Sequence, residues 1–265
     1  MTGLIVAMAL GLTAAMCGAW VLQRYTRNAG WIDVVWSFAT GAAAVAGALG
    51  SGTAPGGRQV AVAALAAAWS LRLGAHLWHR VAHGPEDARY VNFRHAWGAA
   101  YEAYMFGFVL IQALAAFFLA LVVLIAARNP APGLQPGDIA AVLLLAIAIA
   151  GEAIADAQLR RFKAAPAHHG KICDQGLWRW SRHPNYFFEW LVWIAFALFA
   201  LPLPAGGYAW GWAALAGPLL MYWLLVHVSG IPPLEAQMLK SRGAAFVAYQ
   251  ARTNAFFPGP PRSGA

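Results

Sequence analysis

Residues 103–125 read AYMFGFVLIQALAAFFLALVVLI, an apolar run without a charged side chain. A helix of about 20 such residues is long enough to cross the hydrocarbon core of a bilayer. Hydrophobic residues make up 61% of the chain and charged residues only 11%, which is not typical of a soluble domain. Six further apolar runs lie near residues 4–22, 32–49, 60–78, 139–155, 187–203 and 208–228. The sequence therefore predicts an all-α, polytopic integral membrane protein with seven transmembrane helices.

The basic residues are distributed unevenly over the segments between these runs. Apart from Arg72, which lies within a run, the outer segments would hold only Arg58 and Arg128 if the N-terminus were outside. The positive-inside rule therefore predicts an external N-terminus and a cytoplasmic C-terminus. This distribution explains the net charge of +8 by topology and contact with anionic membrane lipids, and no motif indicates nucleic-acid binding. The alanine-rich, lysine-poor composition favours a bacterial protein, and hence the inner (cytoplasmic) membrane.

The segments between the apolar runs are short. The longest, about 80–102, 160–186 and 229–265, are too small to bury a core of their own. The chain has neither a GxGxxG nor a P-loop pattern, so no separate nucleotide-binding domain is expected. We expect one domain over residues 1–265, in which these three inner segments cap the helices and hold any cofactor. Nothing in the sequence implies an obligate protein partner.

Residues 176–189, GLWRWSRHPNYFFE, place charged and polar side chains at the entrance of an apolar helix. Pro184 suits a first helical turn, whose free N–H groups and dipole favour anions, and Arg182 adds a donor of the kind that binds phosphate. Asn185 and Glu189 lie one turn apart on a face that enters the bilayer, where an acidic side chain needs a partner. Snorkelling to lipid head groups would explain Arg182 and His183 but not Glu189.

Glu152, Asp156, Arg160 and Lys163 recur at intervals of four, four and three residues, so they share one helix face. They form either a ladder of salt bridges or a polar wall for a charged ligand. Arg72 lies within an apolar run, where an arginine needs a carboxylate or phosphate partner. His76, His79 and His83 follow it, but no zinc motif is present and no metal is expected. Asp33, about a turn into the second run, is either a favourable N-terminal acid or a carboxyl group in a cavity wall.

These motifs are similar to those of the steroid 5-alpha-reductase superfamily, in its bacterial membrane branch. Two patterns carry the resemblance: Asp156-x-x-Leu159-Arg160-x-x-Lys163, and Gly176-Leu177-Trp178 followed by Arg182-His183-Pro184-Asn185-Tyr186 and Glu189. The resemblance implies a seven-helix fold and NADPH-dependent reduction of a carbon–carbon double bond in a steroid or sterol-like lipid. It implies cofactor contacts at Arg72, His76, Arg80, Arg89, Tyr90, Arg94, Asp156, Arg160, Lys163, Lys171, Trp178, Arg182, His183, Asn185, Tyr186, Glu189, Glu235, Tyr249 and Arg252.

The resemblance is weaker for the groups that would act on the substrate. Asp33 aligns near the acidic pair of the animal enzymes, and Trp69 occupies the position of their tyrosine. By this comparison a protonated Asp33 would hydrogen-bond the carbonyl of a 3-oxo-4-ene lipid that enters from the bilayer, while NADPH supplies hydride to the β carbon. Trp36 and Trp69 would line the lipid pocket.

A second class of enzyme is also compatible with part of this pattern. Membrane methyltransferases of the isoprenylcysteine and phospholipid type have an Arg-His-Pro-x-Tyr element before a helix, and they use S-adenosylmethionine. The basic face around Lys163 and the Asn185/Glu189 pair favour NADPH, whose phosphates need several cations. A transporter is not favoured, because the chain shows no internal repeat and its polar residues gather at one predicted membrane face.

Overall fold

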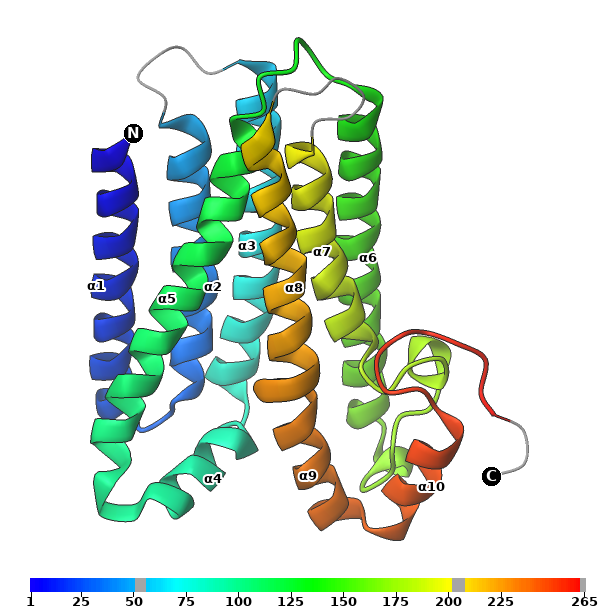
Figure 1. Ribbon diagram of the computed structural model, residues 1–265. Coiled ribbons are helices and arrows are strands. Elements are labelled where there is room, and N and C mark those ends of the chain that lie inside the picture. Colours follow the sequence, from blue (N-terminus) through cyan, green and yellow to red (C-terminus); the bar gives the residue numbers. More distant parts are fainter. Residues whose placement is uncertain (51–55, 202–207, 263–265) are drawn as a thin grey trace. The chain divides into compact units, whose positions relative to one another are not determined.

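The computed structural model describes residues 1–50, 56–201 and 208–262, and throughout these residues the regular elements are helical (Figure 1). The end of the predicted run 187–203 therefore lies outside the described residues. By their contacts the residues divide into two compact units. Unit 1 comprises Met1–Val142 and Phe196–Gly217, and unit 2 comprises Leu143–Ala195 and Pro218–Ala265. Helices α6 and α7 contribute to both units, and the first two residues of α8 belong to unit 1.

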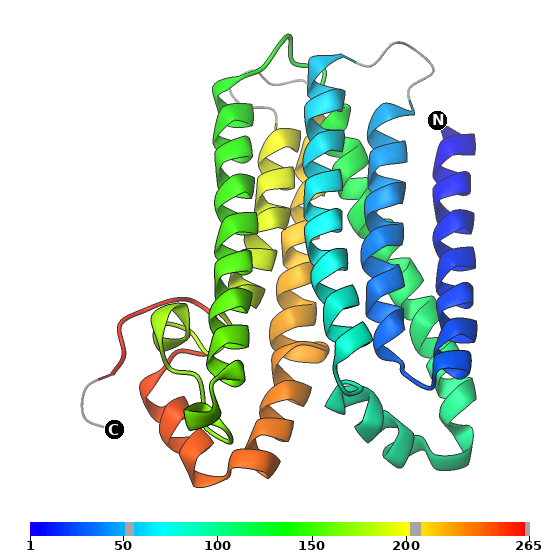
Figure 2. The same ribbon diagram turned by 180° about the vertical axis from the view of Figure 1, so that it is seen from behind.

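Unit 1 is built on four long helices. Helix α5 contacts α1, α2 and α3, and the short helix α4 lies at the end away from the N-terminus, where it connects α3 to α5 (Figure 2). The remaining parts are the first turns of α6, the last turns of α7 and the 3₁₀ segment η4. The bounds are α1 (Thr2–Thr26), α2 (Gly30–Leu49), α3 (Gly57–His83), α4 (Ala88–Trp97), η1 (Gly98–Ala100), α5 (Tyr101–Ala127) and η4 (Ala209–Leu215).

Small residues allow α2 and α3 to pack closely. A Cβ atom on Gly41 would lie only 2.1 Å from the Cβ and Oγ atoms of Ser70, so only glycine fits there without movement. At the same crossing, the Ser70 hydroxyl donates a hydrogen bond of 2.9 Å to the carbonyl oxygen of Ser37. Both serines are buried, and this bond satisfies a polar group where no water is available.

Unit 2 consists of α6 from Leu143 onward, α7 up to Ala195, the interrupted helix α8–η5–α9 from Pro218 onward, and the short helix α10. At Gly151 a Cβ atom would lie 2.3 Å from the Phe188 ring, which shows how closely α6 and α7 approach. A π-helical turn, η5, separates α8 from α9, and there the Ser229 N–H donates to the carbonyl of Leu224 at 2.8 Å. The bounds are α6 (Pro136–Ala164), η2 (Pro166–His168), η3 (Gly176–Arg179), α7 (Pro184–Ala200), α8 (Ala216–Trp223), η5 (Leu224–Val228), α9 (Ile231–Arg242) and α10 (Ala244–Arg252).

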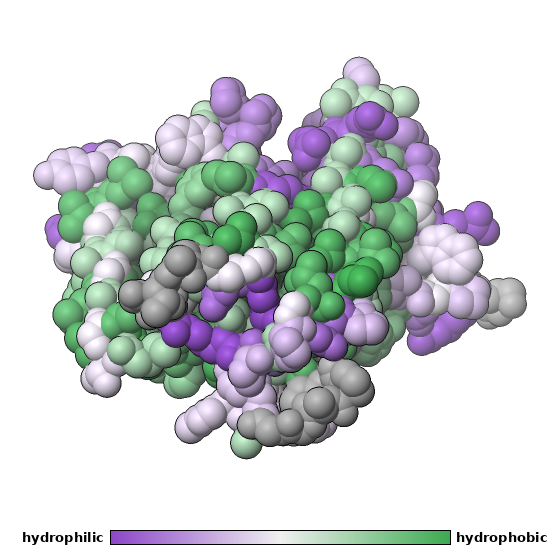
Figure 3. Space-filling view, turned by 90° about the horizontal axis from the view of Figure 1, so that it is seen from above, coloured by the Kyte–Doolittle hydropathy of each residue, from purple (hydrophilic) through white to green (hydrophobic). Residues whose placement is uncertain are grey.

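Six helical stretches of the described residues are long and apolar enough to cross a membrane. The predicted run 187–203 corresponds to α7, which is apolar but has only 17 described residues and is not one of the six. The last predicted run, 208–228, lies in a helical stretch that extends from Ala209 to Arg242. Many large apolar side chains are exposed on these helices, as expected for surfaces that face lipid, and hydrophobic residues are prominent in the end-on view (Figure 3). The chain is therefore a multi-pass membrane protein.

The end of unit 1 near the N-terminus contains a buried ion pair that the sequence did not predict. Arg58 and Asp138, which are 7% and 3% exposed, contact each other through two N···O distances of 2.9 and 2.8 Å. Arg58 also donates to the carbonyl of Gly133, and Asn129 donates to the carbonyl of Phe199 at the end of α7. The carbonyls of Gly133 and Phe199 lie in a turn and at a helix end, where the backbone leaves them without a partner. The Arg58–Asp138 pair and Asn129 therefore have a structural role at this end of unit 1.

Candidate functional site

The first candidate cluster lies in unit 1, at the end that contains α4. Asp33, in the first turn of α2, accepts a hydrogen bond of 2.7 Å from the Tyr90 hydroxyl and one of 2.9 Å from Arg89 Nη2. Arg80 Nη2 lies 3.8 Å from the same carboxylate. The Asp33 side chain is 18% exposed, whereas Tyr90 is almost fully buried. Asp33 is thus the accessible member of a fixed polar pair.

Asp87 organises the arginines of this cluster. It is the N-cap of α4, where its carboxylate accepts from the Arg89 N–H, and it pairs with the Arg89 and Arg80 guanidiniums at 3.1 and 3.5 Å. Burial by itself would raise the pKa of Asp87, but the charge and hydrogen bonds of Arg89, with the charge of Arg80, hold this pKa below its ordinary value. The sequence indicated the arginines of this loop but did not show that Asp87 aligns them.

A second acid–arginine pair attaches the same loop to α2. Glu86 accepts a hydrogen bond of 2.8 Å from the backbone N–H of Ala29 and pairs with Arg94 at 3.0 Å. The Arg94 guanidinium also lies over the Tyr101 ring, 5.0 Å from its centroid. Arg80, Arg89 and Arg94, which the sequence predicted as phosphate ligands, are therefore each paired with a carboxylate of unit 1.

The remaining predicted residues of unit 1 lie on α2 and α3. Trp69 is 1% exposed and packs edge-to-face with Trp36, whose indole donates to the carbonyl of Gln112. This places Trp69 in the helix packing and not on an open surface. Arg72 and His76 are half-buried, one turn apart on α3. Within residues 1–50, 56–201 and 208–262, no group of three His, Cys, Asp or Glu side chains is arranged to hold a metal ion.

The second candidate cluster lies in unit 2, between α6 and α7. Asn185 Nδ2 donates a hydrogen bond of 3.4 Å to Asp156, which the sequence placed on the polar face of α6. Glu152 lies one turn before Asp156, and Glu189 accepts a hydrogen bond of 3.0 Å from the Trp193 indole. All three acids are at most 6% exposed. The structure thus brings together two residues that belong to two separate sequence motifs, Asp156 and Asn185.

The polar face of α6 changes character along its length. Its buried part is acidic, at Glu152 and Asp156, and its last turns carry the exposed cations Arg160 and Lys163. Lys171 is also exposed, in the segment that follows. A buried acidic wall that leads to exposed cations can accept the hydrogen-bond donors of a ligand at one end and its phosphates at the other.

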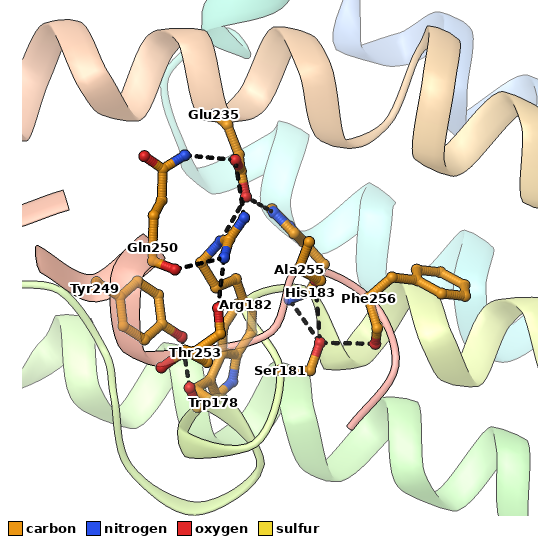
Figure 4. Close-up of polar contacts among 10 residues, drawn as sticks. All are labelled: Trp178, Ser181, Arg182, His183, Glu235, Tyr249, Gln250, Thr253, Ala255 and Phe256. Carbon is orange, nitrogen blue, oxygen red and sulfur yellow. Dashed lines mark hydrogen bonds and ion pairs between the residues drawn. The ribbon is translucent and has the colours of Figure 1, made fainter. Parts of the chain in front are cut away.

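Arg182 and His183 have a role different from the anion site that the sequence predicted (Figure 4). Arg182 Nε and His183 Nε2 both contact Glu235 Oε1 of α9, at 2.7 and 2.9 Å. Gln250 donates to the other carboxylate oxygen at 2.7 Å, and Arg182 Nη1 donates to the carbonyls of Gln250 and Thr253. In the described structure the Arg182 guanidinium therefore joins the start of α7 to α9 and α10 and does not face an open phosphate site.

The environment of His183 favours the neutral form of its ring. The residue is 3% exposed, and burial lowers its pKa, although the hydrogen bond and the charge of Glu235 act in the opposite direction. Its ring stacks on Tyr186 at 5.5 Å, with 12° between the planes. Arg182 and His183 thus both hold the start of α7 in place through Glu235.

The other predicted residues of unit 2 hold the segment before α7 in place. The buried Trp178 indole donates to the carbonyl of Ala155 at 2.9 Å, and the Tyr249 hydroxyl donates to the carbonyl of Trp178. Burial raises the pKa of Tyr249. Arg252 forms an exposed ion pair with Asp174 at 2.6 Å. These contacts join α10 to η3 and to the residues just before it. Trp178, Tyr249 and Arg252 therefore each have a polar partner within the protein.

One family matches most of the chain. Residues 19–253 match the family described as "Protein of unknown function (DUF1295)". The chain belongs to this family. It is associated with membrane proteins that are similar to steroid 5-alpha-reductases. No curated protein matches the chain, and no solved structure matches it.

Two features of these DUF1295 clusters were not found from the sequence. The Tyr90–Asp33 bond joins residues 57 positions apart. Arg182 contacts the Glu235 carboxylate and the carbonyl groups of Gln250 and Thr253, which lie 53 to 71 positions away. Glu235 had a weak signal, a single acid shortly after an apolar run and two prolines. Spacing along the chain could not reveal either partnership, because neither pair shares a helix.

Proposed function

We propose that this protein is a membrane-bound, NADPH-dependent reductase of a lipid that contains a carbon–carbon double bond conjugated to a carbonyl group. The observation that supports this most is the Asp156–Asn185 hydrogen bond in unit 2, because it unites the two motifs on which the reductase resemblance depends. The bilayer would supply the substrate, a 3-oxo-4-ene steroid or a related polycyclic lipid. The active site would open to the cytoplasm of a bacterium.

The residues of unit 2 provide the cofactor groups in this proposal. Asp156, Asn185 and Glu189 offer acceptors and an amide for the polar end of the nicotinamide. Arg160, Lys163 and Lys171, all exposed cations, would bind the pyrophosphate and the 2′-phosphate. NADPH, when bound, supplies the hydride, and the protein supplies orientation and electrostatics. Arg182, His183 and Glu235 act one step away, by fixing the start of α7 that carries Asn185.

Asp33 is the proposed proton-handling group of unit 1. The Tyr90 hydroxyl and Arg89 hold its two carboxylate oxygens, and Asp33 is more exposed than Tyr90. In this arrangement Asp33 accepts hydrogen bonds, so a donor role requires that a proton first be taken up from water. The reaction consumes one enone, one NADPH and one proton, and yields the saturated ketone and NADP⁺. Tyr90 and Arg89 are positioning residues for Asp33.

A ligand titration of the detergent-purified protein tests the cofactor. A ligand that binds only the native state at 100 times its Kd stabilises it by about 2.7 kcal/mol, so NADPH is expected to raise the melting temperature clearly and NADH less. Asn185→Ala and Lys163→Ala are expected to reduce the NADPH effect. Arg161→Ala, an exposed cation outside the polar face, is the matched control. No stabilisation by NADPH in the wild type would contradict the proposal.

One observation favours a second candidate, the S-adenosylmethionine-dependent methyltransferase. Three carboxyl groups, those of Glu152, Asp156 and Glu189, are buried in unit 2, and buried acids suit a ligand that carries an ammonium and a sulfonium group. The same titration separates the two, because stabilisation by S-adenosylmethionine alone would replace the reductase by this enzyme class.

The role of Asp33 has its own test. Asp33→Asn keeps the shape of the side chain and two polar atoms but cannot carry the proton, so turnover of a 4-ene-3-oxo steroid should fall by about 10²-fold or more, with NADPH stabilisation unchanged. Tyr90→Phe should reduce turnover less. Unchanged turnover in Asp33→Asn would remove Asp33 from the mechanism.

A further inference from the structure

Unit 1 contains a groove that the proposed reaction does not use. It has a volume of about 440 Å³ and lies where the last turn of α1, the first half of α2 and the end of α3 meet. Trp31 and Trp78 lie at this groove and pack edge-to-face, with their ring centroids 5.4 Å apart. Leu22, Phe38 and Ala39 line it further along the helices. The lining is apolar except for Thr26, so the groove fits a hydrocarbon chain and no polar group.

A free cation lies next to this groove. Arg27 directly follows Thr26, is exposed, and makes no hydrogen bond or ion pair with the described residues. Its neighbour Arg24, in contrast, pairs with Glu102. The groove and Arg27 together offer what an anionic amphiphile needs, an apolar surface and a positive charge on the residue that follows the lining residue Thr26.

The backbone of Arg27 is an independent indication of function. With φ 53° and ψ 29° it is the left-handed cap of α1, and among the described residues it is the only non-glycine with positive φ. Glycine or asparagine occupies such caps at lower energy. A strained arginine is better explained by what its side chain binds than by the cap itself.

We propose that this groove, from Leu22 to Trp78, binds one acyl chain of an anionic phospholipid whose phosphate group contacts Arg27. The tryptophans at the groove fit this assignment, because tryptophan gathers at the level of lipid head groups. Asp33 and its partners Arg80, Arg89 and Tyr90 are not among the residues that line the groove. The inference does not depend on the reductase proposal. Its expected effect is to hold α1 against α2 and α3.

The experiment uses the purified full chain in detergent. Its melting temperature is measured with increasing phosphatidylglycerol and, separately, with the same mole fraction of phosphatidylcholine, and native mass spectrometry counts retained lipids. Phosphatidylglycerol is expected to stabilise the wild type by several degrees more than phosphatidylcholine. Inorganic phosphate, which lacks the chain, should have no effect. Equal responses to the two lipids, or an equal response to phosphate, would overturn the proposal.

Four variants assign the effect to the groove. Arg27→Gln should lose the preference for phosphatidylglycerol, and Arg161→Gln, another exposed arginine without a partner in the described chain, should keep it. Arg27→Gly should raise the melting temperature without lipid, because it relieves the left-handed strain, and should also lose the preference. Ala39→Leu narrows the groove and should reduce binding of both lipids. A phosphatidylglycerol preference that survives in both Arg27 variants would refute the site.

Discussion

The polar clusters of the two units neutralise their arginines in different ways. In unit 1, Asp33, Glu86 and Asp87 face Arg80, Arg89 and Arg94, so acids and arginines are balanced in number and most pairs lie within one loop. In unit 2, the single carboxylate of Glu235 accepts from Arg182, His183 and Gln250, which come from two segments, the one before α7 and helix α10. The first cluster is partly exposed and has spare partners, while the second is more enclosed and depends on one residue.

This difference predicts where each unit is fragile. Removal of Asp33 or Asp87 leaves the other of these two acids beside Arg80 and Arg89. Removal of Glu235 leaves a nearly buried guanidinium without a counter-charge.

Glu235→Ala should destabilise the protein most, by about 3 kcal/mol, because loss of one partner leaves a buried charge uncompensated. The Arg182 side chain is only 11% exposed, so water cannot replace the carboxylate. Glu235→Gln, which retains an acceptor, should cost less. Unfolding of the detergent-purified variants, followed by circular dichroism, measures the loss. A change within 0.5 kcal/mol, of the size expected for surface sites, would show that Glu235 does not hold α9 and α10 to α7.

Acidification should weaken unit 2 through His183. The pKa of this residue is lowered from 6.5 in the folded protein, so the unfolded chain binds the proton more readily. The stabilisation is complete above pH 6.5 and is lost as the pH falls below that value toward the folded pKa. Melting temperatures between pH 8 and pH 5 measure this loss. His183→Gln retains a donor for Glu235 and does not titrate, so an equally steep acid loss in that variant would contradict the assignment.

Asp87→Ala should have a smaller effect, about 1 kcal/mol, through loss of the N-cap of α4. Asp87→Asn should cost only a few tenths of that, since asparagine also caps helices and Asp33 still faces Arg89. The difference between the two variants in thermal unfolding separates capping from charge. If Asp87→Asn costs as much as Asp87→Ala, charge balance and not capping dominates this cluster.

Asp174→Asn should change stability least, by at most about 0.5 kcal/mol. Its partner Arg252 is 47% exposed and Asp174 is 40% exposed, and exposed ion pairs contribute little. This variant is the control for Glu235→Ala, because it also removes an acid that contacts the C-terminal part of unit 2. A loss near 3 kcal/mol here would remove the contrast between enclosed and exposed pairs.

The sequence was sufficient to predict a helical membrane protein and to single out its charged residues. Apolar runs long enough to cross a bilayer specify membrane helices whatever their neighbours, and charged residues in such a chain are noticeable because their burial is costly. The expected runs correspond to α1, α2, α3, α5, α6 and α7, and the last to η4, α8 and η5. The short helix α4 and the cap α9–α10 were not predicted, because none of them forms an apolar run long enough to cross a bilayer.

Only the tertiary structure decided which charges pair. In the sequence Arg182 has the appearance of a phosphate ligand, and the resemblance places Glu235 among the cofactor contacts. Their contact across 53 positions turns both into a brace for α7. The same holds for Tyr90 and Asp33, and for Asp156 and Asn185, each joined across separate helices. Helical periodicity fixes which side chains share a face, but the partner across the gap depends on how the helices pack, which no local spacing encodes.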